Sequence, residues 1–182
     1  MAHQLTKSEL RETKSKREEF KNIQRNQIYL VLDSLKCAHN IGTILRLADS
    51  LLVKKVYICG NTIVPPNIKI HKGSRGAENW VDWEYCESAE SVVKQLKEQG
   101  VEIVSLEVTS NSIDYRNYNP TKPVCLILGR EFDGVSQNLI DLSDYCIHLP
   151  LLGMANSLNV STATSVALYH IYDKLESKNL LK

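Results

Sequence analysis

The chain has 182 residues, of which 22 are Lys or Arg and 21 are Asp or Glu, giving a formal net charge of +1. This near balance excludes a protein that attracts polyanions through its overall electrostatic field, so any nucleic-acid surface must be a local patch. A chain of this length is expected to form one domain that buries roughly 70% of its unfolded surface. Such a core needs neither disulfides nor a structural metal.

The five cysteines are well separated and form no C-x-x-C pair. This spacing favours reduced core residues over zinc ligands or disulfides. The first residues are charged and lack an apolar signal region, and no apolar run approaches the roughly 18 residues of a membrane span. Together these features predict a cytoplasmic protein with no metal site and no membrane segment.

The first predicted element is a charged helix within an N-terminal extension, residues 1–26, which precedes the main domain, residues 27–182. Thr6 and Glu9 have the spacing of a capping box, and residues 10–25 carry many charged but few large apolar side chains. This pattern is typical of a solvated helix with alternating charges. The alternative is an extension that contacts RNA, and its deletion would weaken RNA binding while leaving the fold intact.

The main domain is expected to alternate strands with helices. Apolar, β-forming runs predict strands at 28–32, 55–59, 81–85, 101–106, 124–128 and 145–149. Helices are predicted at 40–52, 88–99 and 136–142, and from the segment 157–160 onwards. Pro65-Pro66 argues against a helix directly after the second strand. The alternation indicates an α/β fold with a mostly parallel sheet flanked by helices.

Several polar residues stand at the predicted junctions of strands and helices. Asn40 is a good helix N-cap and Arg46 falls on the helix behind it; from their local sequence alone, a cap and a surface charge explain both. A basic, Gly-rich turn at 72–80 could hold a phosphate through Lys72 and Arg75, but such turns are common. No glycine lies between residues 33 and 40, so a nucleotide-dependent oxidoreductase with the G-x-G-x-x-G fingerprint is disfavoured.

Three segments, in order along the chain, carry a more specific signal. They are residues 40–48 (NIGTILRLA), 128–136 (LGREFDGVS) and 147–160 (IHLPLLGMANSLNV). In sequence and order they resemble the motifs of the SpoU (TrmH-like) branch of the SPOUT RNA methyltransferases. A chance match to all three is far rarer than a match to one. The chain departs from the family pattern at Leu51-Leu52, where Phe-Gly is usual, and at Arg130, where Pro is frequent.

The resemblance implies transfer of a methyl group from S-adenosylmethionine to a ribose 2′-hydroxyl of RNA, with tRNA favoured over rRNA. It implies catalytic parts for five residues: Asn40, Arg46, Glu131, Ser157 and Asn159. Since arginine is a poor base at neutral pH, we expect Arg46 to bind a phosphate and stabilise negative charge on the 2′-oxygen. Whether it also takes the proton is left open.

The resemblance further implies a SPOUT-type C-terminal trefoil knot that holds the methyl donor. The implied donor contacts are Leu106, Gly129, Ile147, Leu149, Ser157 and Leu158. RNA contacts are expected at His39, Lys72 and Arg75, with His39 near a phosphate and not acting as a general base. A homodimer is implied, with its interface on the first-motif helix and the C-terminal helix. The competing hypothesis is a non-catalytic RNA-binding protein of the same fold, which has no evident need for all five polar residues.

Overall fold

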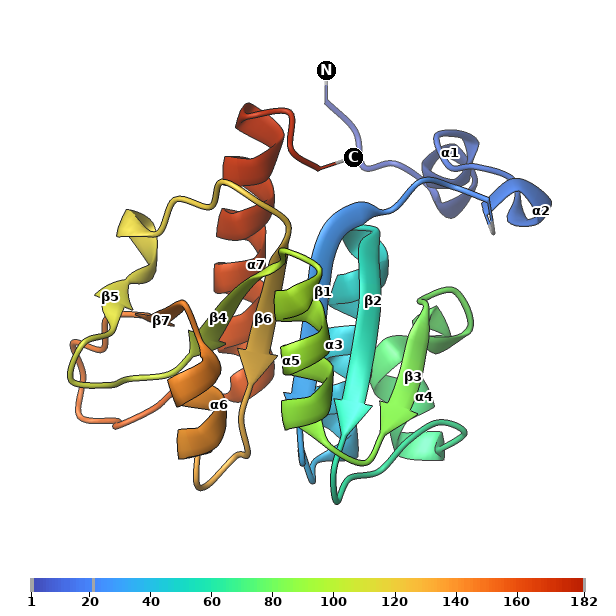
Figure 1. Ribbon diagram of the computed structural model, residues 1–182. Helices are drawn as coiled ribbons and strands as arrows, with labels where there is room; N and C mark the ends of the chain where they lie inside the picture. Colours follow the sequence, from blue (N-terminus) through green and yellow to red (C-terminus); the bar gives the residue numbers. More distant parts are fainter. Residues whose placement is uncertain (1, 21, 182) are drawn as a thin grey trace.

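The computed structural model describes residues 2–20 and 22–181, so Met1, Lys21 and Lys182 lie outside the described residues. At its centre is a seven-stranded sheet of order β3-β2-β1-β6-β4-β7-β5, in which all neighbouring strands are parallel (Figure 1). The strands are β1 (Asn26–Asp33), β2 (Val53–Cys59), β3 (Trp83–Cys86), β4 (Glu102–Leu106), β5 (Ile113–Asp114), β6 (Val124–Leu128) and β7 (Tyr145–His148). Every residue of β6 is buried, as expected for a central strand covered on both faces.

Helices cover both faces of this sheet (Figure 1). One layer contains α3 (Ala38–Ser50), α4 (Ile68–Ser74) and α7 (Val160–Ser177), and the other contains α5 (Ala89–Glu98) and α6 (Gln137–Leu142). Each layer closes its own apolar core, the larger one under α3 and α7. Short 3-10 turns, Ala77–Asn79 and Tyr115–Asn117, complete the connections. The predicted α/β fold with a parallel sheet between helices is confirmed.

The N-terminal extension differs from the single helix predicted for it. The capping box of Thr6 and Glu9 is present at the start of α1 (Lys7–Glu12), but this helix ends early and a separate turn, α2 (Arg17–Phe20), follows. Neither element buries a residue. The Phe20 ring meets the Trp80 ring edge-on, with 5.8 Å between centroids. The extension is therefore attached to the main domain through Trp80.

The region after β2 also differs from the prediction, because α4 begins only two residues after Pro66. The Asn67 side chain accepts hydrogen bonds from the backbone N–H groups of Lys69 and Ile70, which caps the new helix. Lys72 therefore lies on a helix and not in a Gly-rich turn, and Arg75 is the left-handed residue that ends it, with φ 56°. The prolines limit where the helix starts without preventing it.

Glycines allow α3 and α4 to cross closely. A Cβ on Gly42 would lie 2.4 Å from the Ile70 carbonyl oxygen, and one on Gly73 would lie 3.0 Å from the His39 carbonyl oxygen. Gly73 thus serves helix packing instead of the close approach of a phosphate that the sequence suggested.

All five cysteines are free. Cys59 and Cys125 are buried as predicted, whereas Cys37 is exposed, which corrects its assignment to the core. Within residues 2–20 and 22–181, no helix combines the length and the apolar composition needed to cross a bilayer.

Candidate functional site

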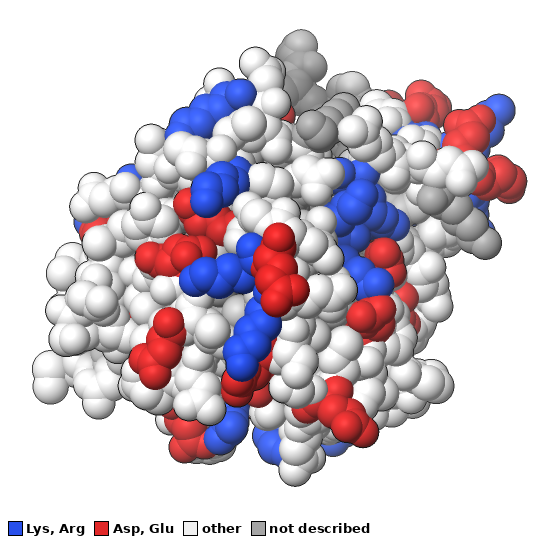
Figure 2. Space-filling model, in the orientation of Figure 1, with Lys and Arg blue, Asp and Glu red and all other residues white. Residues whose placement is uncertain are grey.

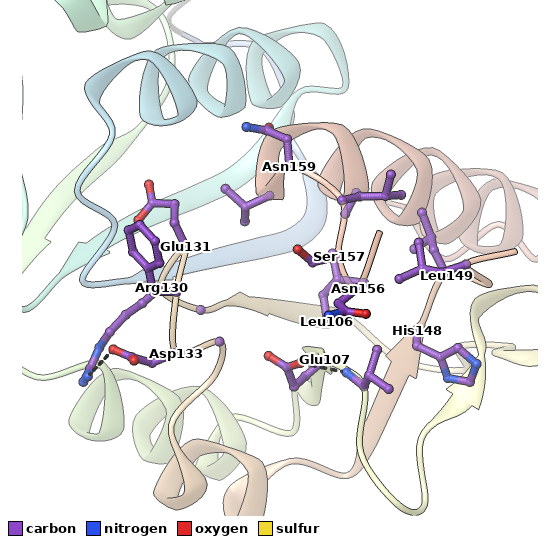
Figure 3. A pocket seen from close by; sticks show the side chains of 18 residues that line it. Leu106, Glu107, Arg130, Glu131, Asp133, His148, Leu149, Asn156, Ser157 and Asn159 are labelled. Atoms are coloured by element: carbon purple, nitrogen blue, oxygen red, sulfur yellow. Dashed lines mark hydrogen bonds and ion pairs between the residues drawn. The ribbon is translucent and has the colours of Figure 1, made fainter. Parts of the chain in front are cut away.

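A cavity of about 500 Å³ opens at the carboxyl edge of the sheet, beyond the ends of β4 and β6 and against the start of α7 (Figure 3). Five of the six residues expected to contact the methyl donor line it: Leu106, Gly129, Leu149, Ser157 and Leu158. The sixth, Ile147, is fully buried in β7 opposite Leu106 of β4, so it supports the wall without lining the cavity. A volume of this size suits a small-molecule ligand.

Gly129 lets the chain fold back on the end of β6. A Cβ at this position would lie 2.1 Å from the Gly134 carbonyl carbon and 2.2 Å from the Val135 nitrogen. The turn between them is closed by two backbone hydrogen bonds joining Arg130 and Gly134, at 3.0 and 3.1 Å. The glycine is therefore required by the backbone of the turn that forms one wall of the cavity.

Side chains of the three motif segments form a continuous chain of hydrogen bonds. Asn40 Nδ2 donates to Glu131 Oε1 at 3.2 Å, and Asn159 Nδ2 donates to Asn40 Oδ1 at 3.0 Å. Asn159 Oδ1 accepts from the Ser161 N–H at 2.9 Å and so caps α7. In Figure 3 the Asn159 amide points out of the cavity toward α3. Asn40, Glu131 and Asn159 thus hold the elements of the site in a fixed relation.

The Glu131 carboxylate also caps α3. It accepts hydrogen bonds from the backbone N–H groups of Lys36, at 3.1 Å, and Cys37, at 2.9 Å. A carboxylate is stabilised here by the unpaired N–H groups and the dipole of the helix. Burial by itself raises the pKa of the Glu131 carboxyl, but these N–H groups and the Asn40 amide outweigh burial and hold this pKa below its usual value.

The structure corrects the local role predicted for Asn40. The N-cap residue of α3 is Cys37, whose side chain makes no capping hydrogen bond, and Asn40 lies in the first turn with only 4% of its surface exposed. The cap comes instead from Glu131, a residue 94 positions away from Cys37. The Asn40 amide is therefore free to link Glu131 with Asn159.

Arg46 and Ser157, by contrast, are open. Both are exposed, and neither side chain makes a hydrogen bond or ion pair with another residue in the described part of the chain. The Ser157 hydroxyl is directed toward the side of the cavity on which Glu131 lies (Figure 3). Arg46 lies farther along α3 and is not among the residues that line the cavity. One chain therefore brings together four of the five predicted catalytic residues.

His39, Lys72 and Arg75, the predicted RNA contacts, are all exposed. Gly73 packs on the backbone of His39, so the crossing of α3 and α4 brings the two other basic residues near the N-terminal turn of α3. On the α5 side of the molecule, Figure 2 shows positive and negative side chains interspersed, without an extended patch of one sign. A local basic surface beside the site agrees with the near-zero net charge.

Sequence reasoning missed five polar residues of the cavity wall: Glu107, Arg130, Asp133, His148 and Asn156. Glu107 directly follows β4, and its place at the carboxyl end of a predicted parallel strand was the signal available. His148 Nδ1 lies 3.0 Å from Ser112 Oγ. Among the described residues, no group of three or more His, Cys, Asp or Glu side chains is placed to hold a metal ion.

Comparison with known proteins identifies relatives of most of the chain. The family model described as the SpoU rRNA Methylase family matches residues 27–169. The tRNA (guanosine(18)-2′-O)-methyltransferase of Aquifex aeolicus (strain VF5) is 31% identical over 158 residues, which cover 86% of this chain and 74% of that protein. The Escherichia coli (strain K12) protein of the same name is 32% identical over 134 residues, 72% of this chain and 56% of that protein.

A solved structure extends this likeness to the fold. The AdoMet-bound rRNA methyltransferase from Sinorhizobium meliloti superposes with a TM-score of 0.77 at 26% identity, and the match covers 86% of this chain and 60% of that one. This chain thus spans between about half and three quarters of the length of these relatives.

Proposed function

The chain belongs to the SpoU rRNA methylase family, and we propose that it transfers a methyl group from S-adenosylmethionine to a ribose 2′-hydroxyl of RNA. The observation that carries this proposal is that the second and third motif segments line one cavity and that Asn40 of the first is hydrogen-bonded to both. The names of the Aquifex and Escherichia relatives favour tRNA over rRNA as the substrate. A non-catalytic RNA-binding role gives no reason for the open Ser157 hydroxyl beside that cavity.

The cavity suits S-adenosylmethionine, which supplies an electrophilic methyl group on its sulfonium sulfur. Leu106, Leu149 and Leu158 offer apolar surface to the adenosyl group, and Gly129 also lines the cavity. Ser157 orients the ribose through its hydroxyl, and Glu131, Asn40 and Asn159 act as positioning residues. Fixing the two reactants in line supplies much of the rate enhancement.

Arg46 acts on the RNA side of the reaction. In the transfer the bond from the 2′-oxygen to the methyl carbon would form as the carbon–sulfur bond breaks, giving S-adenosylhomocysteine and releasing the hydroxyl proton to solvent. The Arg46 guanidinium binds a phosphate and stabilises the negative charge that develops on the 2′-oxygen. Because it does not line the cavity of its own chain, we propose that Arg46 serves the cavity of a second copy. His39, Lys72 and Arg75 then bind the RNA backbone beside the site, and the protein works in the cytoplasm, where these RNAs are modified.

The proposed homodimer places the outer surfaces of α3 and α7 in its interface. Val166 and Tyr169 on α7 are 38% and 48% exposed. Near the cavity, Phe132, Leu152 and Met154 are 99%, 99% and 100% exposed, which is unusual for large apolar side chains unless another surface covers them. A second copy covers them in the proposed assembly.

We also propose that the C-terminal segment forms a trefoil knot. After β7 the chain returns as α7, which packs against β6 and β4. The segment before β6 is hydrogen-bonded to α7 and the residue after it. His170 Nε2 lies 2.8 Å from the Tyr118 carbonyl oxygen, and Lys178 Nζ donates to the Pro120 carbonyl at 2.8 Å. A crystal structure in which the C-terminal segment does not pass through a loop formed by the rest of the chain would contradict the knot.

Mixing two inactive variants tests the function and the composite site together. Arg46→Ala and Ser157→Ala are each expected to lose methylation of unmodified tRNA, measured with radiolabelled methyl donor. Dimers that exchange subunits at equal concentrations should regain about a quarter of the parental activity, because half of them hold one intact site. If each variant is inactive and the mixture regains no activity, the shared site is contradicted. A parental protein that methylates no RNA would contradict the function.

A further inference from the structure

Glu107 is a carboxylate in the wall of the cavity for which the reaction above has no role. It lies at the carboxyl end of β4, half-buried, and its backbone N–H donates to the Ile147 carbonyl at 3.0 Å. Its Oε1 accepts from the Val108 N–H and its Oε2 from the Val135 N–H, both at 2.9 Å. The side chain is thus fixed by the ends of β4 and β7 and by the turn after β6.

The turn is shaped to receive this carboxylate. A Cβ on Gly134 would lie 2.1 Å from Glu107 Oε2, and Gly134 has φ +68°, which disfavours any other residue. The glycine therefore allows both the turn and the close approach of the carboxylate. A side chain held this firmly presents its remaining acceptor positions in a defined direction.

Those acceptor positions are unused. An ionised carboxylate can accept about four hydrogen bonds, and the two backbone N–H groups occupy one position on each oxygen. In the described part of the chain Glu107 forms no ion pair, and the nearby Arg130 is instead 3.6 Å from Asp133. Figure 3 shows the Glu107 carboxylate below Ser157 and Asn156, directed to the same side as the Ser157 hydroxyl.

A pair of acceptors in a nucleoside pocket fits a pair of hydroxyl donors. In dinucleotide-binding folds, an acidic residue accepts a hydrogen bond from a ribose hydroxyl in this way. We propose that Glu107 accepts hydrogen bonds from the 2′- and 3′-hydroxyls of the adenosyl ribose and so selects the methyl donor. This inference rests on the proposed donor site.

Calorimetry with S-adenosylhomocysteine and its 2′-deoxy and 3′-deoxy analogues tests the assignment. The parental protein should bind each deoxy analogue about 10- to 100-fold more weakly, since each loses a hydrogen bond to a charged group. Glu107→Gln should bind S-adenosylhomocysteine more weakly and lose most of its sensitivity to the missing hydroxyl, as in a double-mutant cycle. Asp133→Asn removes the same charge from the same cavity wall, and it should retain the parental sensitivity.

Three outcomes would overturn the inference. If the parental protein binds the deoxy analogues as tightly as S-adenosylhomocysteine, no hydrogen bond to the ribose hydroxyls contributes to binding. If removing a ribose hydroxyl from the ligand weakens binding equally in Glu107→Gln and in the parent, another group makes the contact. A Glu107→Gln variant that weakens only S-adenosylmethionine assigns the carboxylate to the sulfonium charge. Absence of any S-adenosylhomocysteine binding to the parent is a different result, because it contradicts the donor site itself.

Discussion

Two parts of the site differ in how completely a single chain builds them. The supporting part, Glu131, Asn40 and Asn159, has its side chains bonded to one another and to two helix N-termini. The proposed reacting part, Arg46 and Ser157, is exposed and makes no side-chain hydrogen bond within the described residues. Groups whose partners are already present position other groups, whereas open donors and acceptors are available to a ligand. We infer that one subunit folds the scaffold and that RNA and a second copy complete the site.

Arg46→Ala should have the largest effect on activity and almost none on stability. Removing one positioned donor to developing negative charge lowers kcat by about 10²- to 10³-fold. The free energy of unfolding and the affinity for S-adenosylhomocysteine should stay at parental values, because the side chain is exposed and unbonded. Arg46→Lys keeps the charge but loses the planar fork, so it should give an intermediate rate. An Arg46→Ala protein with the parental kcat would contradict a role of Arg46 in the reaction.

Asn40→Ala, in contrast to Arg46→Ala, should cause a large loss of stability. The amide is 4% exposed and bonded on both sides, so its removal leaves parts of Glu131 and Asn159 without partners. We expect a loss of about 1 to 3 kcal/mol in the free energy of unfolding, measured by urea denaturation. Asn117→Ala, at an exposed asparagine, is the control and should change stability by less than about 0.5 kcal/mol. Equal effects of the two substitutions would mean that the hydrogen bonds of Asn40 do not contribute to the free energy of unfolding.

The same comparison explains what the sequence could predict. Apolar runs predicted β1, β2, β4 and β6, because a parallel strand that is buried on both faces consists almost entirely of apolar residues. The motif segments predicted which polar residues converge, but the helix cap was assigned to Asn40. Capping by Glu131 depends on a contact between residues more than 90 positions apart, which local propensity does not contain. Likewise α4 was missed because the prediction rested on the two prolines, whereas the structure starts the helix two residues after them with an Asn67 cap.

Acid should remove the contribution of the Glu131 carboxylate to stability. The folded-state pKa of Glu131 lies below its ordinary value of 4.5, so its bonds to α3 contribute stability above pH 4.5. That contribution is lost as the pH falls through the lowered pKa. At neutral pH, Glu131→Gln should be less stable than the parent by about 1 kcal/mol, and the difference should shrink below pH 4.5. Urea denaturation of both proteins from pH 7 to pH 3 measures it, and a difference independent of pH would contradict the role of the charge.

The far end of α3 belongs to neither part of the site, and there we expect a small gain. Leu52 follows the helix with φ +48°, at the position where the family pattern has glycine. A left-handed residue with a Cβ is strained by about 1 to 2 kcal/mol. Leu52→Gly relieves this strain but loses contacts of a half-buried side chain, so the net gain should be about 0.5 kcal/mol with unchanged activity.

Leu51→Gly is the matched control for that substitution. Leu51 precedes Leu52, has φ −106° and is 5% exposed, so its replacement relieves no strain and empties part of the core. We expect it to lower the free energy of unfolding by about 2 to 5 kcal/mol, opposite in sign to Leu52→Gly. Urea midpoints of the two variants, compared with the parent, measure both effects. A lower midpoint for Leu52→Gly would mean that the contacts of the Leu52 side chain outweigh the strain in its backbone.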